Sequence, residues 1–202
     1  MTHPNIIKII CHDIGKHLGC YGVKSVSTKA IDALAKNGIL FENSYATSPG
    51  CSPSRAAIAT GMYPHNNGVL GLAHAHFGWS LDKKVNHIAK HFFKNNYSSI
   101  LFGLQHVTYN EKTLGFKKIF PERPADAVVK NIKENIDSNL FKKPFYAEIN
   151  FFEPHRPFDF GGVKPFKSKG ISVPKYIPNN HDTRKEFASM QGAIKKMDDS
   201  VA

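Results

Sequence analysis

A cysteine at the start of a predicted helix is the residue of this chain best placed to act as a nucleophile. It opens the segment Cys51-Ser52-Pro53-Ser54-Arg55, which continues through small residues to Thr60-Gly61. Pro53 suits the first helical position and Ser52 the cap before it, so Cys51 is predicted to lie at the positive end of the helix dipole. Free N–H groups there favour an anion, and Arg55 offers a forked donor set one turn further on. The pattern suits a reaction on a sulfate or phosphate group.

Polar residues also follow three predicted strands. Apolar runs at residues 4–10, 97–103 and 144–152 are followed by His12-Asp13, by Gln105-His106 and by His155. A lone histidine is more often structural than catalytic. However, ligands bind at the carboxyl ends of parallel strands, and two histidines here lie just beyond such ends. We therefore expect these side chains to contribute to one site.

The cysteine segment has a family resemblance as well. Cys-x-Pro-Ser-Arg followed by a small-residue helix and Thr-Gly resembles the signature of the formylglycine-dependent sulfatases. The resemblance implies that a formylglycine-generating or sulfatase-maturating enzyme oxidises Cys51 to 3-oxoalanine (formylglycine). The aldehyde is hydrated, one oxygen of the diol attacks sulfur, and the other then expels sulfate. Arg55 would hold this residue, and the substrate would be a small sulfated anion. The plainer alternative is a cysteine beside a capped helix.

The opening segment resembles the sulfatase strand that delivers acidic metal ligands, and Asp13 matches one of them. Where the family has two adjacent aspartates, this chain has His12-Asp13. Imidazole binds divalent ions but is softer than carboxylate, so it suits calcium or magnesium less well. Manganese or zinc becomes a fair alternative. The implied metal ligands are Asp13, His12 and the residue derived from Cys51.

Three further residues are assigned by resemblance to the substrate. His106 matches the histidine of the family's Gly-Lys-x-His element, whose lysine falls on Leu104, leaving Gln105 as a neutral hydrogen-bond donor. His155 matches a substrate-site histidine, the expected acid for the leaving oxygen. His74 lies in a stretch similar to one that shapes the pocket in members like N-sulfoglucosamine sulfohydrolase. The alternative for that stretch is a loop that packs Phe77 and Trp79 against the core.

Composition and charge narrow the class of protein. The 202 residues are 41% hydrophobic and 21% charged, which is typical of a globular chain. No run approaches the ~20 apolar residues needed to cross a membrane. The net charge of +11 could attract nucleic acid, but the 27 Lys and Arg residues are scattered and no nucleic-acid-binding motif accompanies them. The charge is better explained by an anionic sulfated substrate, without nucleic acid or membrane as partner.

Location is predicted from the start of the chain and from its cysteines. The chain enters its first predicted strand without a basic start, a long apolar stretch or a cleavage site. Its three cysteines do not make a disulfide framework. A cytoplasmic location is therefore expected, whereas the sequence makes no prediction of oligomeric state.

Strands alternate with predicted helices at residues 28–36, 85–93, 126–140 and 183–201, the last with Asp182 as its cap. A short extended run is expected at 39–43 and an active-site loop at 154–178. This order predicts an α/β fold with a mostly parallel central sheet and helices on both faces. It resembles the alkaline phosphatase-like superfamily, to which the sulfatases belong.

Residues 1–202 are interpreted as the N-terminal portion of a single sulfatase catalytic domain, incomplete at the C-terminus. The family strand that carries Asp-His-Gly or Asp-Asn-Gly, with the remaining metal ligands, has no counterpart here. Three functions stay open: a sulfatase acting on sulfate esters or sulfamates, a phosphonate or phosphodiester hydrolase of the same superfamily, and an inactive truncated remnant.

Overall fold

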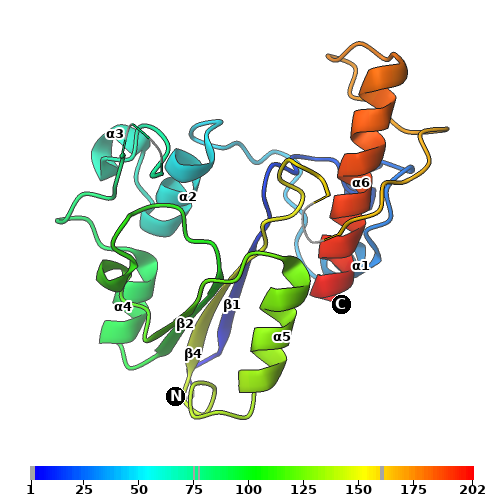
Figure 1. Ribbon diagram of the computed structural model, residues 1–202. Coiled ribbons are helices and arrows are strands. Elements are labelled where there is room, and N and C mark those ends of the chain that lie inside the picture. Colours follow the sequence, from blue (N-terminus) through cyan, green and yellow to red (C-terminus); the bar gives the residue numbers. More distant parts are fainter. Residues whose placement is uncertain (1–2, 75, 77, 160–161) are drawn as a thin grey trace. The chain divides into compact units, whose positions relative to one another are not determined.

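The computed structural model describes residues 3–74, 76, 78–159 and 162–202. Figure 1 shows its helices and strands. In chain order they are β1 (Ile6–Ile10), the 3-10 helix η1 (Gly19–Tyr21), α1 (Lys29–Asn37), α2 (Cys51–Thr60), α3 (Pro64–Asn67), α4 (Ile88–Lys94), β2 (Ser98–Gly103), the 3-10 helix η2 (Glu111–Leu114), β3 (Lys118–Phe120), α5 (Ala125–Asn135), β4 (Phe145–Asn150) and α6 (His181–Val201). None of the described helices combines the length and the apolar character that crossing a bilayer requires.

The four strands form one parallel sheet in the order β1-β4-β2-β3. In the register of β1, β4 and β2, Ile10, Asn150 and Gly103 lie side by side at the carboxyl end. All six residues of β2 are buried, as expected of a parallel strand covered on both faces. The predicted α/β fold with a parallel sheet is thus confirmed.

Aromatic side chains cover the two faces of the sheet. Phe92 of α4 stacks on Tyr146 of β4 with ring centroids 4.6 Å apart. Phe102 stacks on Phe120 at 4.9 Å and lies 6.3 Å from Phe141, which follows α5. Tyr146 is level with Ser99, and strand residues alternate between faces, so Phe102 lies on the opposite face from Tyr146. Figure 1 accordingly shows α4 on one side of the strands and the carboxyl-terminal half of α5 on the other.

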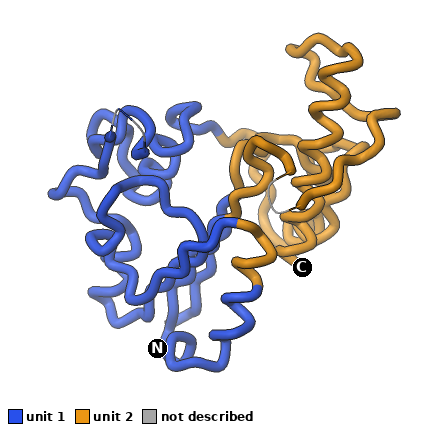
Figure 2. The backbone as a smooth tube through the Cα atoms, in the orientation of Figure 1, with its two compact units in different colours: residues 1–10, 45–123, 130–150 blue, residues 11–44, 124–129, 151–202 orange. Residues whose placement is uncertain are grey.

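The chain divides into two compact units, coloured separately in Figure 2. Unit 1 comprises residues 1–10, 45–123 and 130–150 and contains the whole sheet with α2, α3 and α4. Unit 2 comprises residues 11–44, 124–129 and 151–202 and contains α1 and α6. That residues 1–202 are the N-terminal portion of a single sulfatase catalytic domain stays a prediction.

Several boundaries differ from those predicted, and the reasons are mostly distant contacts. Helix α2 begins at Cys51 with Gly50 as its N-cap, two residues before the predicted start. Helix α6 is capped by the side chain of Asn180, which accepts from Thr183 N at 2.9 Å, so the assignment of Asp182 as its cap is wrong. Residues 39–43 form no strand, whereas the short elements β3 and α3 were not predicted.

In unit 2, two helix starts are capped by buried carboxylates from other elements. Asp198 of α6 accepts from the first-turn N–H groups of Ala30 and Ile31 in α1, at 3.1 and 2.9 Å. Glu153 accepts from Ala125 N at the start of α5 and lies 3.4 Å from the Lys196 ammonium. A carboxylate at a helix N-terminus satisfies free donors and complements the dipole. These contacts fix α1 and α5 to segments distant in sequence.

A buried polar network lies within unit 1. The Glu148 carboxylate accepts from Lys8 Nζ at 2.7 Å, Tyr146 Oη at 2.6 Å and Asn150 Nδ2 at 3.0 Å. Burial alone would raise the pKa of Glu148, but Lys8, His87 and these hydrogen bonds together lower it. Burial and the nearby carboxylate raise the pKa of Tyr146, which therefore donates as a neutral phenol. Because Lys8 and the hydrogen bonds stabilise its charge, the buried Glu148 carboxylate can be ionised within the sheet.

Helix α4 starts at a buried histidine that must stay neutral. His87 is its N-cap, and Nδ1 accepts from Ala89 N at 3.1 Å. Burial lowers the pKa of His87 from 6.5 to about 4, although Glu148 acts in the opposite direction. Protonation therefore costs both the cap and the desolvation of a cation.

We predict that His87→Asn flattens the pH dependence of stability. Between pH 6.5 and 4 the unfolded chain binds a proton at His87 that the folded chain does not. Stability therefore falls with falling pH in this window, by up to roughly 3 kcal/mol for this group. Asparagine keeps an N-cap acceptor but removes the titration. The measurement is urea unfolding at pH steps between 7 and 4.5, above the range in which protonation of Glu148 dominates.

His91→Asn is the matched control, because His91 is exposed on the same helix. It should leave the pH slope of the parent chain unchanged. An equal slope in His87→Asn and in the parent would contradict the assigned role.

Candidate active site

The start of α2 presents a cysteine at the first helical residue. The Cys51 side chain is half-buried, and Gly50 before it has extended backbone angles and no side chain with which to cap the helix. Pro53 occupies the third helical position, where its missing N–H still falls within the first turn. Cys51 therefore lies at the helix start as predicted, but the N-cap is Gly50 and not Ser52. The helix dipole favours negative charge at this end.

Two hydrogen bonds anchor this helix start to loops of unit 1. The Ser52 hydroxyl, predicted as a cap, instead accepts from Ala73 N at 3.0 Å. Arg55 is only 5% exposed and donates from an η-nitrogen to the Leu104 carbonyl at 3.2 Å. The loop before His74 and the loop before His106 are therefore both tied to the turn that carries Cys51.

The Leu104 carbonyl also accepts from Asn150 Nδ2, at 2.8 Å. Asn150 is the last residue of β4 and was not identified from the sequence. A polar residue at the end of a buried strand is a pattern that could have indicated it. Gly103, beside it, has φ +89°, and a Cβ there would lie 1.9 Å from the Asn150 carbonyl oxygen. The end of β2 thus requires glycine. Together these constraints direct the chain into residues 104–106.

Two predicted site histidines lie against each other in unit 1. Nδ1 of His74 faces Nε2 of His106, and the rings stack with centroids 4.2 Å apart at 25°. His106 has φ +60°, an uncommon value for a residue other than glycine that marks a constrained position. Because one of two facing imidazole nitrogens must be unprotonated, the pair is suited to holding and passing a single proton.

Two further predictions in this unit concern the side chains of Gln105 and Trp79, which contact neighbouring loop residues. The Gln105 amide accepts from Val107 N and Thr108 N and donates to Thr108 O. Nε2 carries two hydrogens and only one of these bonds uses it as a donor, so Gln105 shapes the loop while its contact with substrate stays a prediction. Trp79 packs against Gly71, while Phe77 lies outside the described residues.

In unit 2, His12, Asp13 and His155 form a cluster whose ligand atoms all lie within 4.8 Å of one another. His12 Nδ1 and His155 Nε2 each lie 3.9 Å from an oxygen of Asp13. His12 is buried, whereas Asp13 and His155 are partly open to solvent. The structure thus brings together two predicted metal ligands and the histidine predicted for the leaving group. Cys51 belongs to unit 1.

Asp13 also lines a cavity of about 880 Å³ within unit 2. Lys16, Lys175, Tyr21 and Tyr176 contribute to its wall. His17 lines it too, and burial lowers the pKa of this histidine, which favours the neutral ring. Two ammonium groups against one carboxylate make the wall suitable for an anion, and the phenol rings offer flat apolar surface.

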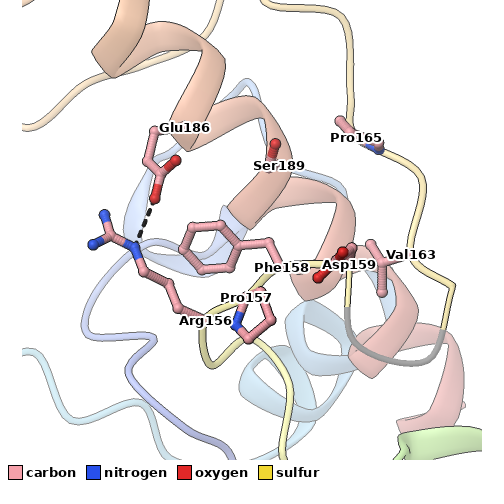
Figure 3. Close-up of a pocket in the computed structure, with 8 residues that line it drawn as sticks. All are labelled: Arg156, Pro157, Phe158, Asp159, Val163, Pro165, Glu186 and Ser189. Atoms are coloured by element: carbon pink, nitrogen blue, oxygen red, sulfur yellow. Dashed lines mark ion pairs between the residues drawn. The ribbon is translucent and has the colours of Figure 1, made fainter.

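A second cavity, of about 540 Å³, lies between α6 and residues 156–159, 163 and 165 (Figure 3). Its arginine, Arg156, forms an ion pair with Glu186 at 2.6 Å, drawn as a dashed line in Figure 3. Asp159 adds a further carboxylate to the described wall. Since its single cation is already paired, this cavity does not favour an anionic group.

In unit 1, a parallel sheet, a helix that begins at a cysteine and a histidine beyond the end of β2 define an α/β protein with a potential nucleophile at a helix start, and comparison identifies its family. A family model described as "Sulfatase" matches residues 4–202, so the chain belongs to the sulfatase family. It is similar to an ulvan-active sulfatase of Formosa agariphila, with 40% identity over 90% of this chain and 35% of the relative. Human N-sulphoglucosamine sulphohydrolase is 22% identical over 98% of this chain and 45% of the relative. The chain thus spans between a third and a half of these curated relatives.

Solved structures show the same fold. A 2-O GAG sulfatase superposes with a TM-score of 0.72 at 23% identity, covering 98% of this chain and 53% of that one. The phosphonate monoester hydrolase of Agrobacterium radiobacter has a TM-score of 0.71 at 18% identity, covering 98% of this chain and 57% of that one. At these identities the likeness concerns the fold alone. The roles assigned to individual site residues stay predictions.

We predict that Gly103→Ala destabilises unit 1 far more than Gly61→Ala. Both glycines have positive φ, but a Cβ at Gly61 meets nothing within 4 Å whereas one at Gly103 would overlap the Asn150 carbonyl. The Gly61 substitution should cost roughly 1 kcal/mol of backbone strain, and the Gly103 substitution roughly 3 kcal/mol. Denaturant unfolding of the two variants measures the difference. Equal losses would show that the strand ends are not packed as described.

Proposed function

We propose that this chain carries the nucleophile-bearing part of a sulfatase that hydrolyses sulfate esters or sulfamates after conversion of Cys51 to formylglycine. The observation that carries the proposal is the position of Cys51 as the first residue of α2 within a family-matched signature. The hydrated aldehyde would supply the oxygen nucleophile. Asp13 would help to hold a divalent metal ion, which would supply positive charge when bound.

The chain's own residues support this chemistry in three ways. The start of α2 favours an anion, so a sulfate group is stabilised beside residue 51. Buried Arg55 fixes the helix start against the Leu104 carbonyl, which positions the nucleophile. The facing imidazoles of His74 and His106 can accept a proton as the nucleophile reacts. His155, open to solvent, remains our candidate acid for the leaving oxygen.

The maturation step has a structural requirement. Pro53 and Arg55 are both buried in α2. An enzyme that reads these side chains together with Cys51 therefore needs the segment before it folds. We propose a formylglycine-generating or sulfatase-maturating enzyme as a transient partner of the unfolded chain.

A sulfated saccharide is the substrate class we favour. The similar proteins are named for activity on ulvan and on N-sulphoglucosamine. The cavity beside Asp13, with its lysines and tyrosines, would suit such a ligand, because phenol rings pack on sugar faces and ammonium groups attract sulfate.

We predict that residue 51 alone is oxidised when the chain is co-expressed with a maturating enzyme. Trypsin should release residues 37–55 as one peptide, in which Cys51 is the single cysteine. Mass spectrometry should find the aldehyde in this peptide and intact thiols at Cys11 and Cys20. Pro53→Ala should reduce the conversion. A thiol at residue 51 in every molecule would contradict the proposal.

Paired kinetics on an aryl sulfate and a phosphodiester separate the remaining alternatives. With aldehyde-bearing protein we expect a higher kcat/KM for the sulfate and its loss in Cys51→Ala. Preference for the phosphodiester would favour the phosphonate or phosphodiester hydrolase. No turnover of either, in protein shown to carry the aldehyde, would favour the inactive remnant.

A further inference from the structure

The cluster of His12, Asp13 and His155 offers two imidazole nitrogens and one carboxylate to a single point. All three ligand atoms lie within 4.8 Å of one another, close enough for one ion to reach each of them after small side-chain adjustments. The rings of His12 and His155 lie edge to face with centroids 5.2 Å apart. The arrangement is contained entirely within unit 2.

This donor set does not fit the hard cations that a sulfatase site with paired aspartates would hold. Calcium takes six to eight oxygen ligands and magnesium near-ideal octahedral oxygen coordination. Two nitrogens with one carboxylate are instead the protein ligands of zinc hydrolases and of iron(II) sites. We propose that His12, Asp13 and His155 bind a divalent transition-metal ion in preference to calcium or magnesium, with His155 as a third protein ligand.

The surroundings hold both histidines in orientations that suit this role. Nδ1 of His155 contacts the Arg156 carbonyl oxygen, which places a proton on Nδ1 and makes Nε2, the atom facing Asp13, the metal-binding nitrogen of the neutral ring. Ligating histidines commonly have such an outer partner, which sets tautomer and ring orientation. His12 is 2% exposed and packs beside Phe152, at 5.5 Å between ring centroids.

The backbone keeps the two ligand segments together. His12 N donates to the Glu153 carbonyl at 3.3 Å, two residues before His155. Asp13 has φ +45°, an uncommon conformation that turns its side chain out of the strand direction. The Asp13 carboxylate is 56% exposed and lines the 880 Å³ cavity. An ion in the cluster would therefore keep open positions on the side of that cavity.

Two sequence predictions change with this inference. The sequence favoured Asp13, His12 and residue 51 as ligands and His155 as the acid for the leaving oxygen, whereas the described cluster joins His155 to His12 and Asp13, so His155 becomes a ligand in place of that acid. The inference depends on the proposed function only for the role of the ion in sulfate hydrolysis. Binding measured on the unmatured chain without substrate tests it separately.

The test is metal titration of the full 202-residue chain with its thiols intact. Calorimetry should show one zinc or cobalt(II) site and at least roughly 100-fold weaker calcium and magnesium binding. The near-ultraviolet spectrum of bound cobalt(II) should lack the intense thiolate charge-transfer band. Calcium binding as tight as zinc binding, or no site for any of the four ions, would overturn the inference.

Variants assign the site to these residues. His155→Ala and Asp13→Asn should each weaken zinc binding by roughly 10-fold or more. His12→Asp should lower the ratio of zinc affinity to calcium affinity. Circular dichroism checks that this substitution at a buried position preserves the fold. His181→Ala, at the exposed start of α6, and Cys51→Ser should leave zinc affinity unchanged.

A competing site at the facing pair of unit 1 is distinguished by His74→Ala. If this substitution or Cys51→Ser abolished zinc binding while His155→Ala did not, the assignment would be wrong. The outcome for the sulfatase proposal is independent, because a chain that binds zinc at His155 but never acquires the aldehyde would support this inference and contradict that one.

Discussion

The structure of unit 1 depends on one carbonyl oxygen that accepts from two directions. Leu104 O receives the Arg55 guanidinium from α2 and the Asn150 amide from the end of β4. These contacts join the helix that carries Cys51 to two neighbouring strand ends. Burial of an arginine is costly unless its donors are used, so the helix and the loop are coupled energetically. The position of His106 follows from this coupling, because its loop has little freedom left.

Buried ionisable groups are the second organising feature. In unit 1, Lys8 and Glu148 compensate each other beneath the sheet, and a neutral His87 starts the neighbouring helix. In unit 2, the Glu153 and Asp198 carboxylates accept from backbone N–H groups at the starts of α5 and α1. They replace the side-chain caps that the residues next to these helices do not provide. Such pairs contribute specificity because a single misplaced segment leaves a charge unpaired in a poorly solvating interior. The fold is therefore specified by polar contacts between distant segments as well as by apolar packing.

The sequence predicted what local pattern determines. Apolar runs ending in polar residues located the three longer strands, of which β2 is buried along its whole length, and the cysteine segment located α2. Contacts between residues far apart in the sequence could not be predicted from local patterns. The start of α2 was misplaced because the Ser52 hydroxyl binds a loop 21 residues away instead of capping its own helix. The grouping of His155 with Asp13 depends on a backbone hydrogen bond between two loops, which no spacing reveals.

We propose that residue 51, once an aldehyde, lies at an anion-binding helix start. Labelling of matured, folded protein by an aminooxy reagent, with and without inorganic sulfate, tests this position. We expect a single label on residue 51, formed more slowly as sulfate is added and unaffected by an equal ionic strength of chloride. Labelling that sulfate does not slow, or a label at any other residue, would contradict it.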